Sequence, residues 1–243
     1  LSDAGIPHGV LTDEEVIHGG LMKSRVAILT HHPHPPAREI ESLKLFVRRG
    51  GKLIVFYGAE PALAELMGVR LGQYQKADAP GRWSSFTFLK PSFWKVPERV
   101  YQESSNIMPA SPGRRSTHVI AYWEDSHGRR AAEPAWLASD NGLWMTHVLL
   151  DDDAANKRDM LTGLLASLDP AVWTYAAQNA LDGDRVCAEG HERAGPDGVE
   201  QVPGDVLRDG QPRGVDQHEP LNQARVARGE VDRDLPAHRV ADP

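Results

Sequence analysis

Cysteine is almost absent from this sequence of 243 residues, because the only one is Cys187. Residues 1–177 therefore contain no disulfide, no thiolate nucleophile and no cysteine ligand for a metal ion. They also contain no Gly-x-Ser-x-Gly sequence, which in many hydrolases places a serine on a sharp turn after a strand. Two common nucleophiles are thus missing, and we predict no catalytic residue and no bound cofactor or metal ion.

Long hydrophobic runs are lacking as well. The chain shows no signal peptide and no apolar stretch long enough to cross a membrane, which predicts no membrane partner. It begins at Leu1 and enters a connector-like stretch, residues 4–9, at once. We therefore expect a truncated N-terminus, and the cellular location stays open because a signal peptide could have been lost with it.

No stripe of basic residues runs through the chain. The sequence has 34 acidic and 27 basic residues, and residues 178–243 hold 14 of the acidic and 8 of the basic ones, so the preceding part is nearly neutral. The basic pairs Arg114-Arg115 and Arg129-Arg130 fall in predicted loops. This distribution predicts no nucleic-acid partner.

After Ala177 the composition changes abruptly. Aromatic residues, Ile, Met, Lys, Ser and Thr are all absent from residues 178–243, which cannot bury enough apolar surface to offset their chain entropy. Except for Asn179, Cys187 and Asn222, every residue there belongs to the types that codons beginning with G or C encode. We predict a disordered tail and hypothesise that it is frameshifted translation, with a natural acidic tail as the alternative.

A complete strand-helix-strand unit can be read in residues 25–57. An apolar strand at 26–30 is followed by Pro36, which suits the first turn of a helix, and by apolar residues at helical spacing. Gly50-Gly51 then ends the helix before a second apolar strand at 52–57. Two apolar strands joined by a helix of this length predict a parallel pair inside a covered sheet.

Apolar patterns and turn residues predict further elements up to residue 177. We expect a short helix at 12–17, a helix at 62–67, a return toward the sheet at 69–74, strands at 85–89, 96–101, 117–123, 135–138 and 142–150, and a last helix ending near 168. This order predicts an α/β domain over residues 1–177, a three-layer α/β/α sandwich whose mostly parallel sheet has antiparallel additions at one edge.

Three histidines, His31, His32 and His34, follow the first predicted strand, and the carboxyl ends of parallel strands are where such sheets bind ligands. Imidazoles this close together could hold a zinc or copper ion. Pro33 and the prolines after His34, however, make a stiff extended loop in which adjacent histidines point apart. We prefer a solvated loop to a metal site, and keep the three histidines as candidate ligand-binding residues together with Tyr57 after the second strand.

Three carboxylates, Asp151, Asp152 and Asp153, follow the predicted strand at 142–150 and could bind magnesium or calcium. A helix begins after them, so capping of its first turn and its dipole explain them without an ion. We favour capping, and keep Asp151 as a candidate ligand-binding residue.

Aromatic residues are dense between Trp83 and Trp94. Their flat rings could stack on sugars, because an aromatic face is apolar and carries a quadrupole. Packing in a core or against another domain is the commoner use of such side chains. We keep both tryptophans as candidate carbohydrate contacts, and the segment as a candidate docking surface for a further domain.

Several phrases point to one family. They are GIPHGV at 5–10, LKLFVRRGGKLIVFY at 43–57, LMGVRLG at 66–72 and THVLLDDD at 146–153 with Lys157. Together they resemble the class I glutamine amidotransferase-like, flavodoxin-like domain of family-10-like bacterial glycoside hydrolases and, more distantly, the trimerisation domain of some β-galactosidases. The phrase at 46–55 also recurs in trehalose-utilisation-type proteins. The resemblance implies a flavodoxin-like fold and a role in carbohydrate metabolism.

True amidotransferases place a cysteine on a tight strand-to-helix turn and pair it with a histidine, and residues 1–177 offer no such cysteine. The resemblance therefore implies a non-catalytic accessory or oligomerisation domain, whose catalytic partner is a β/α barrel missing from this chain or another subunit. Two alternatives stay open. One is a free-standing sugar- or small-molecule-binding module that uses the loops after Thr30, Tyr57 and Leu150, and the other is a hydrolase that uses Ser or His residues of those loops.

Overall fold

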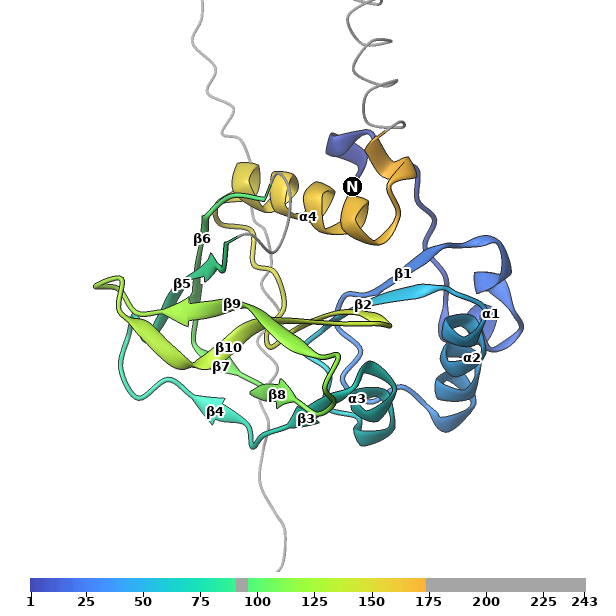
Figure 1. The fold of residues 1–243 in the computed structure, drawn as a ribbon, viewed down its shortest axis with the longest axis horizontal. Helices are drawn as coiled ribbons and strands as arrows, with labels where there is room; N and C mark the ends of the chain where they lie inside the picture. The colour runs from blue at the N-terminus through green and yellow to red at the C-terminus, as the bar shows by residue number, and fades with distance from the viewer. Residues whose placement is uncertain (91–95, 174–243) are drawn as a thin grey trace, which may run out of the picture. The chain divides into compact units, whose positions relative to one another are not determined.

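The computed structural model describes residues 1–90 and 96–173, which all fall in one compact unit (Figure 1). The predicted tail at 178–243, with its frameshift hypothesis, and the candidate sugar contact Trp94 lie outside the described residues. The predicted domain boundary at 177 lies outside them as well.

Four α-helices and two short 3₁₀ helices are present in the described residues. They are η1 (Ser2–Ala4), α1 (Asp13–Ile17), η2 (Gly20–Lys23), α2 (Ala37–Arg48), α3 (Pro61–Met67) and α4 (Ala154–Leu168). The start of α1 is a capping box, in which Thr12 accepts from the Glu15 amide and Glu15 accepts from the Thr12 amide. The helix predicted from this pattern at 12–17 is confirmed.

Seven strands form one curled, mixed sheet in the order β1-β2-β11-β10-β9-β5-β6. They are β1 (Val26–Leu29), β2 (Lys52–Phe56), β5 (Trp83–Phe88), β6 (Arg99–Ser104), β9 (His118–Glu124), β10 (Arg130–Ser139) and β11 (Gly142–Met145). Strands β1, β2 and β11 are parallel, with Val26 beside Lys52 and Met145 beside Phe56. The predicted β1-α2-β2 unit is thus confirmed.

The prediction of a mostly parallel sheet is wrong. Antiparallel pairing joins β11 to β10, β10 to β9, β9 to β5 and β5 to β6, which is more than the two parallel pairs. Short turns, such as the one at 140–141, can join only antiparallel neighbours, whereas each parallel pair needs a long crossover. The strands predicted at 117–123 and 135–138 pair as the antiparallel β9-β10 hairpin, which continues directly into β11.

Two further predictions differ from the structure. Residues 69–74 do not return to the main sheet, because β3 (Val69–Leu71) pairs with β8 (Ala110–Pro112) in a separate two-stranded sheet. A second small sheet joins β4 (Gln75–Lys76) to β7 (Asn106–Ile107). The strand predicted at 142–150 is shorter, since β11 ends at Met145.

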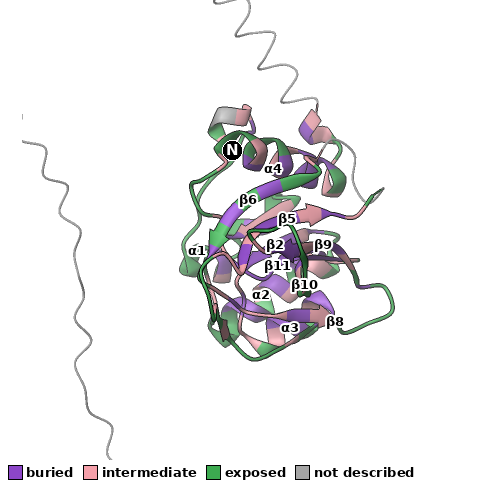
Figure 2. Cartoon of the chain, turned by 90° about the vertical axis from the view of Figure 1, so that its left-hand side faces the viewer, coloured by how far each residue is buried: buried purple, intermediate pink, exposed green. Residues whose placement is uncertain are grey.

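The central strand β2 separates two apolar cores. Its Leu53 and Val55 pack with α1, α2 and α3, whereas Ile54 and Phe56 pack with α4 on the opposite face, as the alternation of a strand requires. Figure 1 shows α4 on one side of the sheet and α2 and α3 on the other, and Figure 2 shows buried residues concentrated between these layers.

None of the helices in the part of the chain described here is both long and apolar enough to cross a bilayer. Many of the large aromatic side chains are instead buried in the two apolar cores. Four fully buried tryptophans, Trp83, Trp123, Trp136 and Trp144, are among their largest members. Burial of large side chains of this kind contributes roughly 2–3 kcal/mol each, so the sheet is held mainly by apolar packing.

Substitution of Gly142 tests the close approach of β11 to β2. A Cβ at Gly142 would lie 1.9 Å from the Leu53 carbonyl oxygen, and its φ of +135° already disfavours a side chain. We expect Gly142→Ala to lower the free energy of unfolding by about 4 kcal/mol or more, measured by chemical denaturation. The matched control is Gly50→Ala, whose φ is also positive but whose Cβ meets nothing within 4 Å, so only roughly 1–2 kcal/mol should be lost. Equal losses at the two positions would contradict the tight contact.

Candidate functional site

Three parallel strands end at the same edge of the sheet, and an aromatic or imidazole ring follows each of them. His31 lies in the loop after β1, Tyr57 directly follows β2, and His147 follows β11. The ring centroids of His31 and Tyr57 are 6.0 Å apart in a stacked arrangement, and those of Tyr57 and His147 are 5.4 Å apart edge to face. These three side chains are called the strand-end cluster below.

Tyr57 stands on a tight turn between β2 and α3. Its φ is +53°, and only one other non-glycine residue of the described part, Asp153, also has a positive φ. Such backbone costs on the order of 1–3 kcal/mol and persists where the surroundings fix it. Here the Tyr57 amide donates to the Met145 carbonyl at 3.0 Å, and a Cβ on the next residue, Gly58, would lie 2.4 Å from the Trp144 ring.

The hydroxyl of Tyr57 already has a partner, because it donates to Asn106 Oδ1 at 2.6 Å. Burial, and to a lesser degree the nearby Tyr74, raises the pKa of the Tyr57 phenol. Its proton is therefore held more firmly than in a free tyrosine. A phenol in this state is a hydrogen-bond donor and a ring surface, and it is poorly suited to attack a substrate.

His147 is buried, and its Nδ1 lies 2.9 Å from the Val148 carbonyl and 3.2 Å from the Gln102 amide nitrogen. Burial lowers the pKa of His147, a change that His31 and Lys157 reinforce and the bond to Val148 opposes. The imidazole is thus neutral near pH 7. With Nδ1–H donating to Val148, Nε2 stays available as an acceptor, since it has no hydrogen bond to any described residue.

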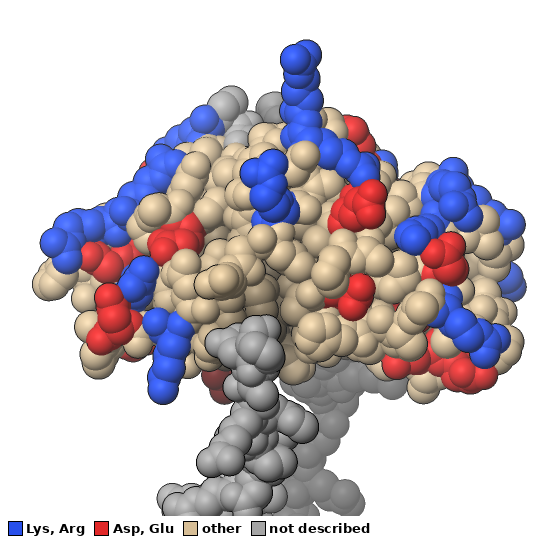
Figure 3. Space-filling model, turned by 90° about the horizontal axis from the view of Figure 1, so that it is seen from below, with Lys and Arg blue, Asp and Glu red and all other residues tan. Residues whose placement is uncertain are grey.

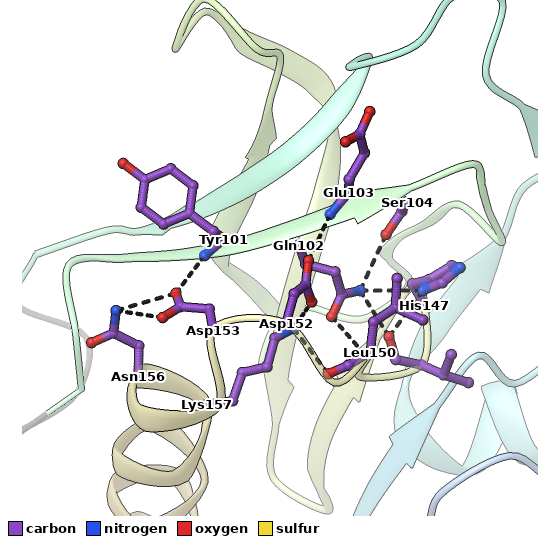
Figure 4. A network of polar contacts seen from close by, with 11 residues as sticks. Tyr101, Gln102, Glu103, Ser104, His147, Leu150, Asp152, Asp153, Asn156 and Lys157 are labelled. Atoms are coloured by element: carbon purple, nitrogen blue, oxygen red, sulfur yellow. Dashed lines mark hydrogen bonds and ion pairs between the residues drawn. The ribbon is translucent and has the colours of Figure 1, made fainter. Parts of the chain in front are cut away.

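Gln102 orients the loop that carries His147 (Figure 4). This fully buried side chain of β6 donates to Ser104 Oγ at 3.1 Å and to the Val148 carbonyl at 2.8 Å, and accepts from the Leu150 amide at 3.0 Å. One amide therefore fixes both sides of the turn after β11. Satisfied buried polar groups of this kind specify a single local geometry.

The aspartates after this turn cover the edge strand β6. The Glu103 amide donates to Asp152 at 3.2 Å and the Tyr101 amide to Asp153 at 2.8 Å, so two outward N–H groups of the edge strand β6 are covered by carboxylates. Uncovered N–H groups on an edge strand invite pairing with another chain. Asp152 is held in turn by the buried Lys157, which also donates to the Leu150 carbonyl at 3.0 Å.

The prediction that these aspartates cap α4 through their side chains is wrong. Asp153 is the residue before the helix, but its side chain makes no capping bond, because its φ of +51° turns the carboxylate toward β6 instead. Asp151 is exposed, and its ligand-binding role stays a prediction.

The three predicted histidines do not converge. His31 joins the strand-end cluster, His32 Nε2 lies 2.8 Å from Glu39 Oε2, and His34 is exposed with Nδ1 4.0 Å from Glu60 Oε2. His32 is therefore paired and partly buried, and it is no solvated loop residue. Asp13 Oδ2 lies 3.6 Å from the same His32 nitrogen, so an imidazole and two carboxylates meet there.

The sugar-stacking role predicted for Trp83 is wrong. This side chain is 0% exposed and belongs to the core between the sheet and α4, so neither ring face is open to a ligand. The pairing of β5 with both β6 and β9 encloses it. Core packing, the commoner use of tryptophan, applies here.

Sequence reasoning missed His147, Gln102 and Asn106. A signal for His147 was present, because Thr146-His147 closes an apolar strand and histidine is unusual inside such a strand. It was hidden by the prediction that the strand runs to 150. The roles of Gln102 and Asn106 can be recognised only from the structure, because β6 and β7 are distant in sequence from the residues they contact, Val148, Leu150 and Tyr57.

No family model and no curated protein matches the sequence. Among solved structures, a ThuA-like protein from Bacteroides uniformis is similar with a TM-score of 0.51 at 10% identity, over 65% of this chain and 75% of that one. For an α-L-fucosidase isoenzyme 2 from Paenibacillus thiaminolyticus, the TM-score is 0.46 at 14% identity, over 63% of this chain and 26% of that one. For a glutamine amidotransferase from Thermotoga maritima, the TM-score is 0.33 at 13% identity, over 70% of each chain. The first likeness shows a shared fold, and the other two scores are too low to support an inference.

The lowered pKa of His147 predicts a specific pH dependence of stability. As the pH falls through the ordinary histidine value near 6.5, the unfolded chain takes up a proton that the folded chain still refuses, so His147 makes the fold less stable at acid pH. We expect His147→Asn to lose less stability than wild type between pH 7.5 and 5.5 in urea denaturation. The exposed His118 provides the control, because His118→Asn should keep the wild-type slope. An unchanged slope in His147→Asn would contradict the buried neutral state.

Proposed function

We propose that this chain is a non-catalytic accessory or oligomerisation domain of a carbohydrate-active protein. One observation carries the proposal: a tyrosine, Tyr57, stands on the tight turn between β2 and α3, beside His147. The amidotransferases that the sequence resembles carry a cysteine on a strand-to-helix turn and pair it with a histidine. We infer that this chain keeps the turn and the histidine and carries a tyrosine in place of the nucleophile.

The chemistry of the replacement supports this proposal. The Tyr57 hydroxyl donates a hydrogen bond to Asn106 Oδ1, and the pKa of Tyr57 is raised, so the phenolate form is disfavoured. His147 offers an acceptor nitrogen, but its ring meets the edge or face of the Tyr57 ring, and no hydrogen bond joins the two. A strand-end cluster of this kind is suited to packing or to binding.

Four exposed apolar side chains come from the segment before α1, from η2 and from α2. They are Val10, Leu11, Met22 and Leu45, and Met22 contacts Arg49, the residue that follows α2 and comes four positions after Leu45. Exposed apolar side chains that lie together mark interaction sites. We propose that this surface, named the helical apolar patch, packs against the catalytic β/α barrel or against a second copy of the domain.

The charge distribution supports a protein partner and no nucleic acid. On the face of the molecule seen in Figure 3, basic and acidic side chains are interspersed, without a continuous basic area. Phosphate backbones are bound by clustered Lys and Arg residues. The flavodoxin-like arrangement and the link to glycoside hydrolases rest on the sequence phrases at 43–57 and 146–153.

The second candidate function is a free-standing module that binds a sugar or another small molecule. His31 is exposed at the strand ends, and the Tyr57 ring contacts both His31 and His147. Rings together with a few polar atoms are what such sites use. This observation favours binding through the strand-end cluster, and the hydrolase alternative has no comparable group of residues in its favour.

Sedimentation velocity over a wide range of protein concentration separates the two candidates. For an accessory or oligomerisation domain, we expect concentration-dependent association that the double change Met22→Lys, Leu45→Lys abolishes, because charged side chains in the helical apolar patch oppose its burial. Both side chains are exposed, so the melting temperature should stay within a few degrees of wild type. The control is His34→Lys, an exposed position outside the patch, which should leave association unchanged.

A sugar titration gives the opposing outcome. A wild-type protein that stays monomeric at every concentration, and whose NMR signals from His31, Tyr57 and His147 shift on addition of a monosaccharide, would contradict the accessory role and favour the binding module.

A further inference from the structure

We propose that Asp13, His32 and Glu39 form a binding site for a divalent transition-metal ion, with zinc as the first candidate. Their donor atoms are carboxylate oxygens of Asp13 and Glu39 and the Nε2 atom of His32, and all three lie within 4.8 Å of one another. The site is separate from the strand-end cluster and independent of the proposed function.

Three separate segments supply the ligands. Asp13 is the first residue of α1, His32 lies in the loop after β1, and Glu39 belongs to the first turn of α2. The capping box of Thr12 fixes the backbone that precedes Asp13, and Ser42 of α2 donates to the Ile17 carbonyl, which links the two helices. The convergence of the ligands is therefore a property of the packed fold.

The spacing fits zinc. Tetrahedral zinc with ligand bonds of about 2.0–2.1 Å needs donor atoms about 3.3 Å apart. The distances from His32 Nε2 are 2.8 Å to Glu39 Oε2 and 3.6 Å to Asp13 Oδ2, one slightly shorter and one slightly longer than that value. The Asp13 and Glu39 oxygens lie within 4.8 Å of each other, so the ion requires side-chain adjustment, and the exposure of Asp13 leaves coordination positions for water.

Burial of Glu39 is the second observation that points to a cation. Glu39 is only 3% exposed, and its carboxylate faces into the cluster, where His32 is its single partner among the described residues. A buried carboxylate is costly unless a positive charge or a metal compensates it. Asp13 adds a second negative charge 3.6 Å from the same imidazole nitrogen, so even a protonated His32 compensates one carboxylate and leaves the other.

The donor set also selects the kind of ion. Magnesium and calcium prefer ligand sets made entirely of oxygen, whereas an imidazole nitrogen with carboxylates suits zinc, cobalt, nickel or copper. The plain alternative is a His32–Glu39 ion pair without a metal. That alternative leaves Asp13 only the dipole of α1, in whose first turn it lies, and its one side-chain partner in the described part of the chain is His32.

The test is a titration of the full chain, freed of metal with a chelator, with zinc in a calorimeter. We expect one tight site, and on the order of 100-fold weaker binding in Asp13→Asn and in His32→Gln. Asp13 is exposed, so its variant should fold normally even if His32→Gln does not. The matched control is His34→Gln, a histidine of the same loop outside the cluster, which should bind zinc as wild type does.

Cobalt provides an independent readout, because its visible absorption reports the ligand set without any activity. Wild type and His34→Gln should share one spectrum, and Asp13→Asn should lose it. The proposal is overturned if wild type binds zinc no more tightly than Asp13→Asn, or if His34→Gln weakens binding as much as the other two changes.

Discussion

The parallel alignment of β1, β2 and β11 is the constraint on which the rest of this structure depends. Because the three strands run in the same direction and in register, the segments that follow them emerge at one edge of the sheet. Residues far apart in the sequence, His31, Tyr57 and His147, meet there as a consequence. The antiparallel strands have a supporting task, since β6 and β7 supply the side chains of Gln102 and Asn106 that fix the geometry of this edge.

The turn at Tyr57 depends on this alignment, because its backbone pairs with the end of β11. The Tyr57 amide donates to the Met145 carbonyl, and Gly58 lies so close to Trp144 that a Cβ there would clash with its ring. At this turn Tyr57, whose hydroxyl donates to Asn106, supplies an aromatic ring and a hydrogen-bond donor. The proposed zinc site differs in kind, because it depends on how α1 packs against α2 as well as on His32 in the loop after β1.

The sequence was sufficient to predict the helices and strands whose ends are marked by nearby proline or glycine residues. The β1-α2-β2 unit follows from its apolar periodicity and the Gly50-Gly51 stop. The strand predicted at 142–150 was too long, because Val148 and Leu150 continue the apolar pattern while Gln102, a distant residue, bonds their backbone groups and removes them from the sheet. The antiparallel share of the sheet likewise depends on long-range pairing that no local pattern specifies. For the site, the sequence indicated His31 and Tyr57, and could not indicate which residues they would meet.

The most direct test of the claim that Tyr57 occupies a nucleophile position is the reactivity of a thiol placed there. In a chain carrying Tyr57→Cys and Cys187→Ser, the rate of alkylation by iodoacetamide is followed against pH. If the turn and His147 still form a nucleophile site, the thiol should titrate below the ordinary cysteine value of about 8.5 and react more slowly after His147→Asn. A thiol that titrates at or above that value, with no effect of His147, would contradict the claim.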